Sequence, residues 1–379
     1  MRWLDDLGPE FGLYIHWPYC SAKCPYCDFN SHVATRIDHA AWAEAYQREI
    51  ERIAGLIGTR VLSTIYFGGG TPSLMEAGTV EAVIRQATAV WAPANDLEVT
   101  LEANPTSVEA GRFRAFRDAG VNRVSLGVQA LNDLDLRRLG RMHTADEALA
   151  ALEIARETFD RVSFDLIYAR QDQTLEAWEA ELEAALRLMP DHLSMYQLTI
   201  EPGTVFGRRA EAGRLPGLPD EGLEADMYAV TQERTDAAGL PAYEVSNHAA
   251  VGQEARHNLI YWTGREFAGI GPGAHGRIEV NGHRMATAAV LSPDEWLAGD
   301  GAVYSDWSVV PRDEQLTELL LMGLRLRDGV RLDRLAALGF DLRAANDLRD
   351  EGWLEVDGPR LRLTEAGRPL LNAVLERLV

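Results

Sequence analysis

Three cysteines lie within one eight-residue segment, and the rest of this 379-residue chain has none. Cys20, Cys24 and Cys27 are separated by three and two residues, and they follow the apolar run 12–17, which predicts a β-strand. Thiolates at this spacing can converge on one inorganic centre. A [4Fe–4S] cluster normally takes four thiolates, so three leave one iron open to a small molecule. The segment therefore predicts a cofactor site rather than a structural crosslink.

Two other interpretations of the cysteines are open. A disulfide with one free thiol is disfavoured, because residues 1–8 lack the basic start and apolar stretch of a signal peptide. No apolar run approaches the roughly 20 residues that cross a bilayer, so we expect a cytoplasmic protein, whose thiols stay reduced. A zinc site is the stronger alternative, since His16 or His32 would supply a fourth ligand. The spacing places iron–sulfur ahead of zinc.

The Cys-x3-Cys-x2-Cys pattern after a first strand resembles the signature of the radical S-adenosylmethionine (SAM) enzymes. The resemblance implies that Cys20, Cys24 and Cys27 hold a [4Fe–4S] cluster and that the amino and carboxylate groups of SAM chelate the open iron. One electron then cleaves the sulfonium to give a 5′-deoxyadenosyl radical. The resemblance covers nearly the whole chain. It matches the branch that holds the oxygen-independent coproporphyrinogen III dehydrogenases (oxidases) and the haem chaperones of the HemW type.

Apolar, β-rich runs alternate with amphipathic helical stretches along the first two thirds of the chain. The candidate strands are 13–16, 63–67, 98–102, 123–128, 162–167 and 192–198, and the helical patterns between them are 41–57, 79–91, 108–119, 146–158 and 175–188. Strands separated by helices of this length predict parallel βαβ units. Six such units indicate an α/β fold with a partial (β/α)6 barrel of the TIM type, and the resemblance supports a radical SAM barrel.

The chemical motifs fall at the carboxyl ends of these strands, where active residues of such barrels lie. Cys20 follows the first strand, the glycine-rich turn 68–72 the second, and Glu102 closes the third; Gln129 ends the fourth, and Asp165 lies in the fifth. The resemblance implies SAM contacts at Gly69, Gly70, Thr71, Glu102, Gln129, Arg141 and Asp165, with Tyr14 and Tyr26 near the cluster. Carboxylates suit the ammonium and hydroxyl groups of SAM, and an arginine suits its carboxylate.

One loop departs from the family pattern. The family shows Gly-Leu-Pro-Gly-Gln after the Asp-Leu-Ile-Tyr of the fifth strand, whereas this chain continues with Ala169-Arg-Gln-Asp-Gln173. The segment 169–172 has lost both glycines and the proline. We therefore expect a different local backbone there, and the resemblance does not carry the SAM pose over to this loop.

The segment 257–262 has the form His-Asn-x-x-Tyr-Trp, which resembles the haem-binding motif of the chaperone branch. The resemblance implies haem binding by His257, Tyr261 and Trp262, because an imidazole can ligate haem iron and aromatic rings can flank a porphyrin. Residue chemistry alone favours buried core aromatics with a hydrogen-bonded histidine. His248 and His275 are nearby alternative ligands.

An absent cysteine separates the two branches. The resemblance implies that the dehydrogenases carry a fourth cysteine two positions after the third, where this chain has Phe29, as the chaperones do. We therefore expect a haem chaperone that delivers haem to apoproteins such as respiratory enzymes, rather than an enzyme. The alternative is an oxygen-independent coproporphyrinogen III dehydrogenase. The resemblance also leaves room for an electron donor, a transient contact with a membrane protein and a dimer.

Three domains are expected: a radical SAM core over 1–220, a connecting haem-motif region over 221–310, and a C-terminal α+β winged-helix-like domain over 311–379. Short strands at 353–356 and 360–363 flank Asp-Gly, which is a hairpin signal. The last domain has 11 arginines against 13 acidic residues, and the chain has a net charge of −21. Nucleic acid is therefore excluded as a partner, together with a zinc-stabilised nucleic-acid binder. Lys23 is the only lysine.

A glycine-rich stretch at 271–276 formally matches the dinucleotide fingerprint G-x-G-x-x-G. That fingerprint requires a helix after the glycines, and the residues that follow here predict a strand. We therefore reject a dinucleotide site.

Overall fold

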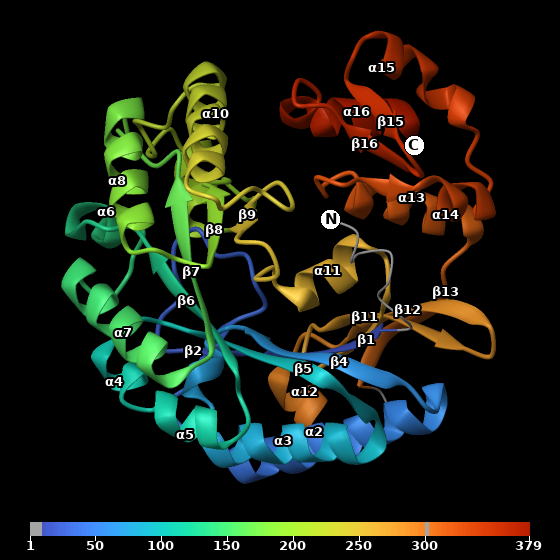
Figure 1. The fold of residues 1–379 in the computed structure, drawn as a ribbon. Helices are drawn as coiled ribbons and strands as arrows, with labels where there is room; N and C mark the ends of the chain where they lie inside the picture. Colours follow the sequence, from blue (N-terminus) through green and yellow to red (C-terminus); the bar gives the residue numbers. More distant parts are fainter. Residues whose placement is uncertain (1–9, 300–302) are drawn as a thin grey trace.

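A computed structural model describes residues 10–299 and 303–379. Its centre is an eleven-stranded sheet in the order β13-β12-β11-β10-β1-β4-β5-β6-β7-β8-β9 (Figure 1). The six consecutive parallel strands are β1 (Glu10–Trp17), β4 (Val61–Gly69), β5 (Ala92–Ala103), β6 (Arg123–Gln129), β7 (Arg161–Tyr168) and β8 (His192–Gln197). All six predicted strands are confirmed, and the sheet is that of a partial (β/α)6 barrel.

Helices cover the outer face of these strands (Figure 1). The helices in this part of the chain are α2 (His39–Ile57), α3 (Ala77–Val90), α4 (Ser107–Ala110), α5 (Phe113–Asp118), α6 (Asp133–Arg138), α7 (Ala145–Thr158), α8 (Leu175–Arg187), α9 (Val205–Glu211) and α10 (Glu221–Ala237), and of these α9 lies against the cysteine loop, where the Phe206 N–H donates to the Pro25 carbonyl. The single helix predicted over 108–119 is wrong. It is two short helices, because at Arg112 the backbone N–H turns to the Glu109 carbonyl, three residues back, and the four-residue pattern of an α-helix is interrupted.

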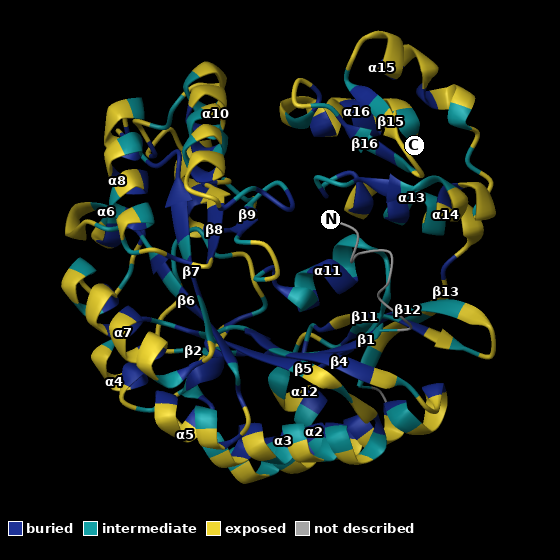
Figure 2. Cartoon of the chain, viewed as in Figure 1, coloured by how far each residue is buried: buried dark blue, intermediate teal, exposed yellow. Residues whose placement is uncertain are grey.

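Side-chain alternation separates two environments along each parallel strand. On β1, Leu13, Ile15 and Trp17 are fully buried and join the main hydrophobic core with α2. The intervening Tyr14 and His16 point the other way, because successive side chains of a strand alternate between faces. Figure 2 shows buried strands surrounded by helices whose outer surfaces are exposed. The interior face is therefore free to carry polar side chains.

The region between the barrel and the C-terminus extends the same sheet. Strand β9 (Asn247–Ala249) is antiparallel to β8, and β10 (Glu266–Ile270) is parallel to β1 on its other side. The antiparallel strands β11 (His275–Val280), β12 (His283–Ala289) and β13 (Tyr304–Val309) follow, with α11 (Arg256–Trp262) and α12 (Pro293–Ala298) in the same region. The strand predicted after the glycine-rich stretch is confirmed as β11.

The C-terminal region has a small hydrophobic core of its own, distinct from the main one. It contains α13 (Arg312–Gly323), α14 (Leu332–Ala337), α15 (Asn346–Asp350) and α16 (Leu371–Leu378), with a sheet of β14 (Val330–Arg331), β16 (Arg360–Leu363) and β15 (Leu354–Asp357). The predicted hairpin is confirmed, with Gly358 in its turn at φ 56°. Helices with a small hairpin give the expected winged-helix-like α+β arrangement.

Ionic contacts join this region to the rest of the molecule. The carboxylate of Glu244 is fully buried and pairs with Arg325 at 3.2 Å. Arg277 on β11 pairs with Glu318 on α13 at 2.6 Å, and Arg334 on α14 donates to the Gly264 carbonyl. The C-terminal region is therefore fixed against Glu244 before β9, against β11 and against the turn after α11. In the described part of the chain, no helix has the length and apolar character needed to cross a membrane.

Candidate functional site at the carboxyl ends of the strands

The three cysteines lie on a loop that leaves the sheet after β1. Two short parallel strands, β2 (Tyr19–Cys20) and β3 (His32–Val33), close the base of this loop, and the Cys27 N–H donates to the Cys24 carbonyl at 3.2 Å. All three are free, partly exposed thiols. Burial raises the pKa of the Cys20 and Cys27 thiols. Nearby cations or hydrogen-bond donors are therefore required if they are to act as thiolates.

Donors from other strands reach two of these thiols. The Thr71 hydroxyl donates to Cys20 Sγ at 3.4 Å, and the Arg141 guanidinium donates to Cys24 Sγ at 3.4 Å. Asn104 links the two donors: its Oδ1 accepts from Arg141, and its Nδ2 donates to the Thr71 hydroxyl. The cysteine loop, the turn after β4, the end of β5 and the segment after α6 thus converge on one place.

Glycines allow the turn after β4 to approach the cysteine loop. The Gly70 N–H donates to the Trp17 carbonyl at 2.7 Å, and a Cβ on Gly70 would lie 2.7 Å from the Tyr19 carbonyl oxygen. Gly69 has a φ of 109°, which few other residues adopt, and a Cβ there would meet the His16 ring. Both positions therefore need glycine for a steric reason.

Two acidic side chains lie inside the barrel below this junction. Glu102 accepts from the Tyr66 hydroxyl at 2.7 Å, and Asp165 accepts from Ser125 at 3.4 Å. Both carboxylates keep some accessible surface, but burial in the barrel raises the pKa of Glu102 to about 7 and that of Asp165 to about 6. The nearby charge of Asp165 raises the pKa of Glu102 further. The interior therefore holds carboxyl groups poised near neutrality.

Two polar atoms at this end of the barrel are buried without a hydrogen-bond partner among the described residues. They are Gln129 Oε1 and Arg141 Nε. Gln129 is also in the left-handed backbone region, at φ 71°. Because buried polar groups are almost always satisfied, these atoms indicate a place where a polar ligand completes the hydrogen bonding. Tyr26 adjoins Arg141 and Cys24, and burial raises the pKa of its hydroxyl.

The predicted SAM residues are thus brought to one end of the barrel. Tyr14 is also there, with its hydroxyl 3.0 Å from His16 Nδ1. His16, the candidate zinc ligand, uses both ring nitrogens, because its Nε2 lies 2.9 Å from the Asn30 carbonyl. No three Cys, His, Asp or Glu side chains in residues 10–299 and 303–379 form a group that would hold a single metal ion.

The predicted haem residues lie on α11, which packs against β1, β4 and β10 of the main sheet. His257 is buried, and its two ring nitrogens lie 2.6 Å from the Thr64 hydroxyl and 2.6 Å from the Tyr261 hydroxyl. Burial lowers the pKa of His257 to about 3, so the ring is neutral. Trp262 packs its ring against the Arg325 guanidinium at 4.7 Å. In this arrangement neither nitrogen of His257 has a free lone pair or proton directed at a ligand.

The atypical loop after β7 has two residues with positive φ, a conformation typical of glycine, although neither residue is glycine. Ala169 and Asp172, at the two positions where the family pattern has glycine, have φ values of 57° and 56°. The expectation of a backbone different from the family's stays a prediction. For residues other than glycine the left-handed region costs about 1–2 kcal/mol each, so surrounding contacts must hold the loop.

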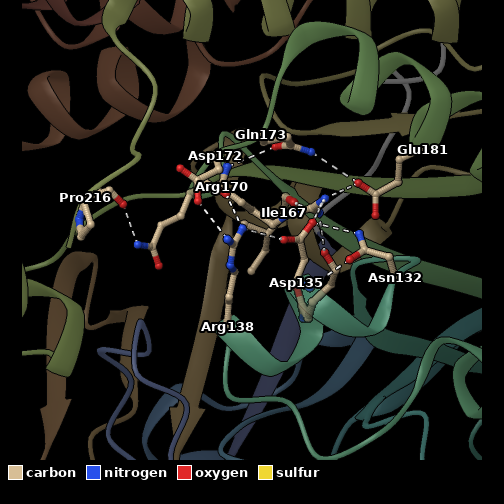
Figure 3. Close-up of polar contacts among 11 residues, drawn as sticks. Asn132, Asp135, Arg138, Ile167, Arg170, Asp172, Gln173, Glu181 and Pro216 are labelled. Carbon is tan, nitrogen blue, oxygen red and sulfur yellow. Dashed lines mark hydrogen bonds and ion pairs between the residues drawn. The ribbon is translucent and has the colours of Figure 1, made fainter.

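Two arginines supply these contacts (Figure 3). Arg170 is almost fully buried; it donates to the Ile167 carbonyl at 2.6 Å and pairs with Asp135 at 2.9 Å and with Glu181. Arg138 pairs with Asp172 at 2.9 Å. The backbone of the loop is further tied by Asp172 N–H donating to the Gly217 carbonyl at 2.6 Å. Arg170 thus connects β7, α6 and α8 around the loop.

Sequence reasoning missed three interior residues that organise the site. Tyr66 holds Glu102, Asn104 joins Thr71 to Arg141, and Arg123 lies buried beside the Ser163 hydroxyl at 3.0 Å. The signal was strand alternation, since Tyr66 shares a face with Thr64 and Gly68, and Arg123 shares one with Ser125 and Gly127. Large polar residues on the inward face of a barrel strand mark the interior of a site.

Comparison with known proteins gives matches over nearly the whole chain. Residues 14–185 match the model of the radical SAM superfamily, and residues 310–370 match that of the HemN C-terminal domain. The heme chaperone HemW of Escherichia coli is 36% identical, over 97% of this chain and 98% of its own length. The radical S-adenosyl methionine domain-containing protein 1, mitochondrial, of Bos taurus is 40% identical over 97% of this chain and 87% of its own.

A solved structure shares the fold. Coproporphyrinogen III oxidase (HemN) from Escherichia coli, a radical SAM enzyme, superimposes with a TM-score of 0.80 at 22% identity, over 98% of this chain and 90% of that one. At that identity the likeness concerns the fold alone.

Proposed function

The chain belongs to the radical SAM superfamily, in the family of HemN and the HemW heme chaperones, and from this premise we propose that it binds haem and delivers it to haem-requiring apoproteins. The observation that carries the proposal is the similarity to HemW, which extends over both the barrel and the C-terminal region. Phe29 at the position of the fourth cysteine of the dehydrogenases supports a carrier over a porphyrinogen-oxidising enzyme.

We propose that Cys20, Cys24 and Cys27 hold a [4Fe–4S] cluster and that SAM binds beside it. The residues present fit both groups: three free thiols share one loop, and Thr71 and Arg141 direct hydrogen bonds at two of them. When bound, the cluster supplies an electron for reductive cleavage of SAM. Arg141 also stabilises negative charge on the Cys24 sulfur.

The SAM-binding set is proposed as Gly69, Gly70, Thr71, Glu102, Gln129, Arg141 and Asp165, with Tyr14 and Tyr26 near the cluster. Because Gly69 and Gly70 have no side chains, a ligand has room to approach the backbone of this turn. The unpaired Gln129 Oε1 accepts a hydrogen bond from a hydroxyl or ammonium group. The carboxyl group of Glu102 has a pKa of about 7, so it holds or releases a proton near neutral pH. It lies next to the Tyr66 hydroxyl, which donates a hydrogen bond to it.

The proposal that the protein binds and delivers haem rests on its family, and not on an exposed iron ligand on α11. His257, Tyr261 and Trp262 stay a prediction for haem binding, because His257 bonds Thr64 and Tyr261 through its two nitrogens. Haem ligation by His257 would require one ring nitrogen to break its hydrogen bond and become accessible to the iron. This makes the location of the haem a separate question from the function.

Further parts of the proposal rest on the same premise. Three free thiols suit a reducing compartment such as the cytoplasm. We also propose the division into 1–220, 221–310 and 311–379, of which the separate C-terminal core supports only the last boundary. We further propose that respiratory apoproteins receive the haem, that an electron donor serves the cluster, and that membrane-protein contact and dimer formation accompany transfer. Net charge of −21 supports reversible docking to a basic partner surface.

The proposed function is tested with protein reconstituted anaerobically with iron and sulfide. We expect saturable, near-stoichiometric haemin binding by absorption, and no decarboxylated porphyrinogen when the reduced protein receives SAM and coproporphyrinogen III. Formation of that product would assign the dehydrogenase activity instead. A haemin titration that never saturates would refute haem carriage.

A further inference from the structure

Asn104 lies between the two side chains that donate hydrogen bonds to cysteine sulfurs. It follows the end of β5; its Oδ1 accepts from Arg141, and its Nδ2 donates to the Thr71 hydroxyl at 3.3 Å. Thr71 donates in turn to Cys20 Sγ and Arg141 to Cys24 Sγ, each at 3.4 Å. One amide therefore connects the donors of two different thiols.

The partners of Asn104 determine which way its amide faces. A guanidinium only donates, so the group that faces Arg141 must be the oxygen Oδ1. At the other end, Glu109 Oε1 accepts from Nδ2 at 3.4 Å, and Glu109 Oε2 accepts from the Asn104 backbone N–H at 2.9 Å. A flipped amide would turn its NH2 group to the guanidinium and its oxygen to the carboxylate. The amide is thus fixed between a cation and a carboxylate.

Glu109 is a buried anchor for this arrangement. It lies on α4, is 5% exposed, and also accepts from the Ser73 hydroxyl. Ser73 belongs to the same turn after β4 that carries Thr71. A buried carboxylate needs several donors, and three are present here: the Ser73 hydroxyl and the backbone and side-chain N–H groups of Asn104. The carboxylate therefore ties the turn after β4 to the end of β5.

The fixed amide also determines the direction of the Thr71 hydroxyl. Because Asn104 Nδ2 donates to Thr71 Oγ1, the hydroxyl proton must point away from Asn104. The Thr71 backbone N–H donates to the Tyr19 carbonyl at 2.8 Å, which holds the residue beside Cys20. The hydroxyl proton is then directed at Cys20 Sγ.

The same amide aligns the Arg141 guanidinium. Arg141 Nη2 donates to Asn104 Oδ1 and to the Gly127 carbonyl, the latter at 2.9 Å, and Nη1 is left to face Cys24 Sγ. A guanidinium is always charged, so its hydrogen bond to a thiolate is charge-assisted. Asn104 therefore directs one neutral and one cationic donor at two of the three sulfurs.

We infer that Asn104 sets the reduction potential of the cluster proposed on the three cysteines. Hydrogen bonds to cluster sulfurs stabilise the additional negative charge of the reduced state, so they raise the reduction potential. Asn104 acts through Thr71 and Arg141 and is therefore a positioning residue. This inference rests on the proposed function and deepens it, because it names the side chain that makes the cluster easier to reduce.

The test measures the midpoint potential of the reconstituted protein without SAM, by anaerobic redox titration followed by electron paramagnetic resonance. Thr71→Val removes the hydroxyl donor. It should change the equilibrium between oxidised and reduced cluster about tenfold, which is about 59 mV towards lower potential for one electron. Thr71→Ser keeps the hydroxyl and should keep the wild-type potential.

A double-mutant cycle then tests Asn104 itself. In Asn104→Asp the carboxylate still accepts from Arg141 but has no N–H for Thr71, so the Thr71 hydroxyl turns to it and away from Cys20. The potential should fall in Asn104→Asp, and adding Thr71→Val should lower it no further. Asn104→Leu should also lower the potential, which separates the lost hydrogen bonds from the added negative charge.

Asn122 provides the matched control. Its Oδ1 accepts from the Val99 N–H and its Nδ2 donates to the Leu97 carbonyl, each at 2.8 Å, just before β6 begins. Asn122→Asp adds the same charge at the opposite end of the parallel strands. The potential should therefore stay at the wild-type value, and Thr71→Val should keep its full effect in that variant.

The outcomes separate this inference from the proposed function. If Thr71→Val lowers the potential equally in wild type and in Asn104→Asp, Asn104 does not orient the hydroxyl and the inference is wrong. A wild-type potential in Asn104→Leu would overturn it as well. So would loss of the cluster from both Asn104 variants with unchanged circular dichroism, since Asn104 would then serve retention of the cluster. Wild-type protein that takes up no cluster would instead overturn the proposed cluster.

Discussion

The buried guanidinium of Arg170 is expected to be the largest single electrostatic contribution to the loop after β7. Its side chain is 4% exposed and pairs with Asp135 and Glu181, whose side chains are 14% and 7% exposed. Arg170→Leu keeps an apolar side chain in the space but leaves Glu181 without its cation, and Asp135 keeps only Arg138 at 3.6 Å. Removing one partner of a buried ion pair costs about 3–5 kcal/mol.

That cost translates into a measurable change in melting temperature. The entropy of unfolding is about 2.1 cal/mol/K per residue, so 3–5 kcal/mol lowers the Tm of a chain of this length by about 4–6 °C. Thermal unfolding followed by circular dichroism measures the shift. Arg170→Lys should fall between wild type and Arg170→Leu, since lysine keeps the charge but cannot make the paired hydrogen bonds of the guanidinium.

A double variant checks the cause. Arg170→Leu/Glu181→Gln removes one orphaned charge, while the Gln side-chain oxygen still accepts the Leu131 N–H, which Glu181 accepts at 2.6 Å. The double variant should be more stable than Arg170→Leu alone, because it lacks that unpaired buried charge. The effects of the two neighbouring substitutions are therefore not additive. A Tm for Arg170→Leu within about 1 °C of wild type would refute the reasoning, since it would mean that the two carboxylates do not need the cation.

Four further predictions follow from single sites. Ala169→Gly should stabilise the chain by about 0.5–1 kcal/mol in chemical denaturation, because relief of the left-handed backbone exceeds the added unfolded-state entropy; destabilisation would contradict this. Glu102, whose pKa rises from 4.5 to about 7 through burial, contributes stability that is complete below pH 4.5 and is lost as pH rises through 7. Glu102→Gln should therefore flatten that pH dependence, which amounts to roughly 3 kcal/mol, in unfolding measured from pH 4 to 8. Arg325→Ala leaves the fully buried Glu244 unpaired and should speed hydrogen exchange across the C-terminal region, whereas unchanged exchange would show that the pair does not fix it. Cys24→Ser should lower the iron content from about four atoms per chain after reconstitution, and a full complement would exclude Cys24 as a ligand.

Local periodicity predicted most of the barrel. The six parallel strands and most helices have side-chain patterns that depend only on neighbours in sequence, and the chemical residues followed from strand ends. The C-terminal hairpin was found because Asp357-Gly358 favours a tight turn. The break between α4 and α5 was missed, because nothing in the apolar spacing around Gly111 distinguishes one helix from two.

Non-local pairing limited the rest of the fold. Strand β10 pairs with β1 although Phe11 and Glu266 are some 250 residues apart, and no local pattern indicates such a partner. The strands β11 to β13 therefore appeared only as a connecting region. The conformation of Ala169 and Asp172 was unpredictable for a related reason, since it is held by contacts of the loop with α6 and α8: Arg138 pairs with Asp172, and Arg170 of the loop pairs with Asp135 and Glu181.

The candidate site was also predictable only in part. Chemistry and spacing identified the cysteines and their strand-end companions, but burial decides what a histidine can do. His257 has the residue pattern of a ligand, and its hydrogen bonds to Thr64 and Tyr261 occupy it.

Transfer of haem tests the central claim most directly. Anaerobically reconstituted protein loaded with one equivalent of haemin is mixed with a spectroscopically distinct haem-free acceptor, and the Soret band of the acceptor is followed over time. The account predicts that the acceptor fills from the loaded protein while the [4Fe–4S] absorption is retained. Haem that stays on the protein when the acceptor is in excess, or fills the acceptor no differently from free haemin, would contradict a function in haem delivery.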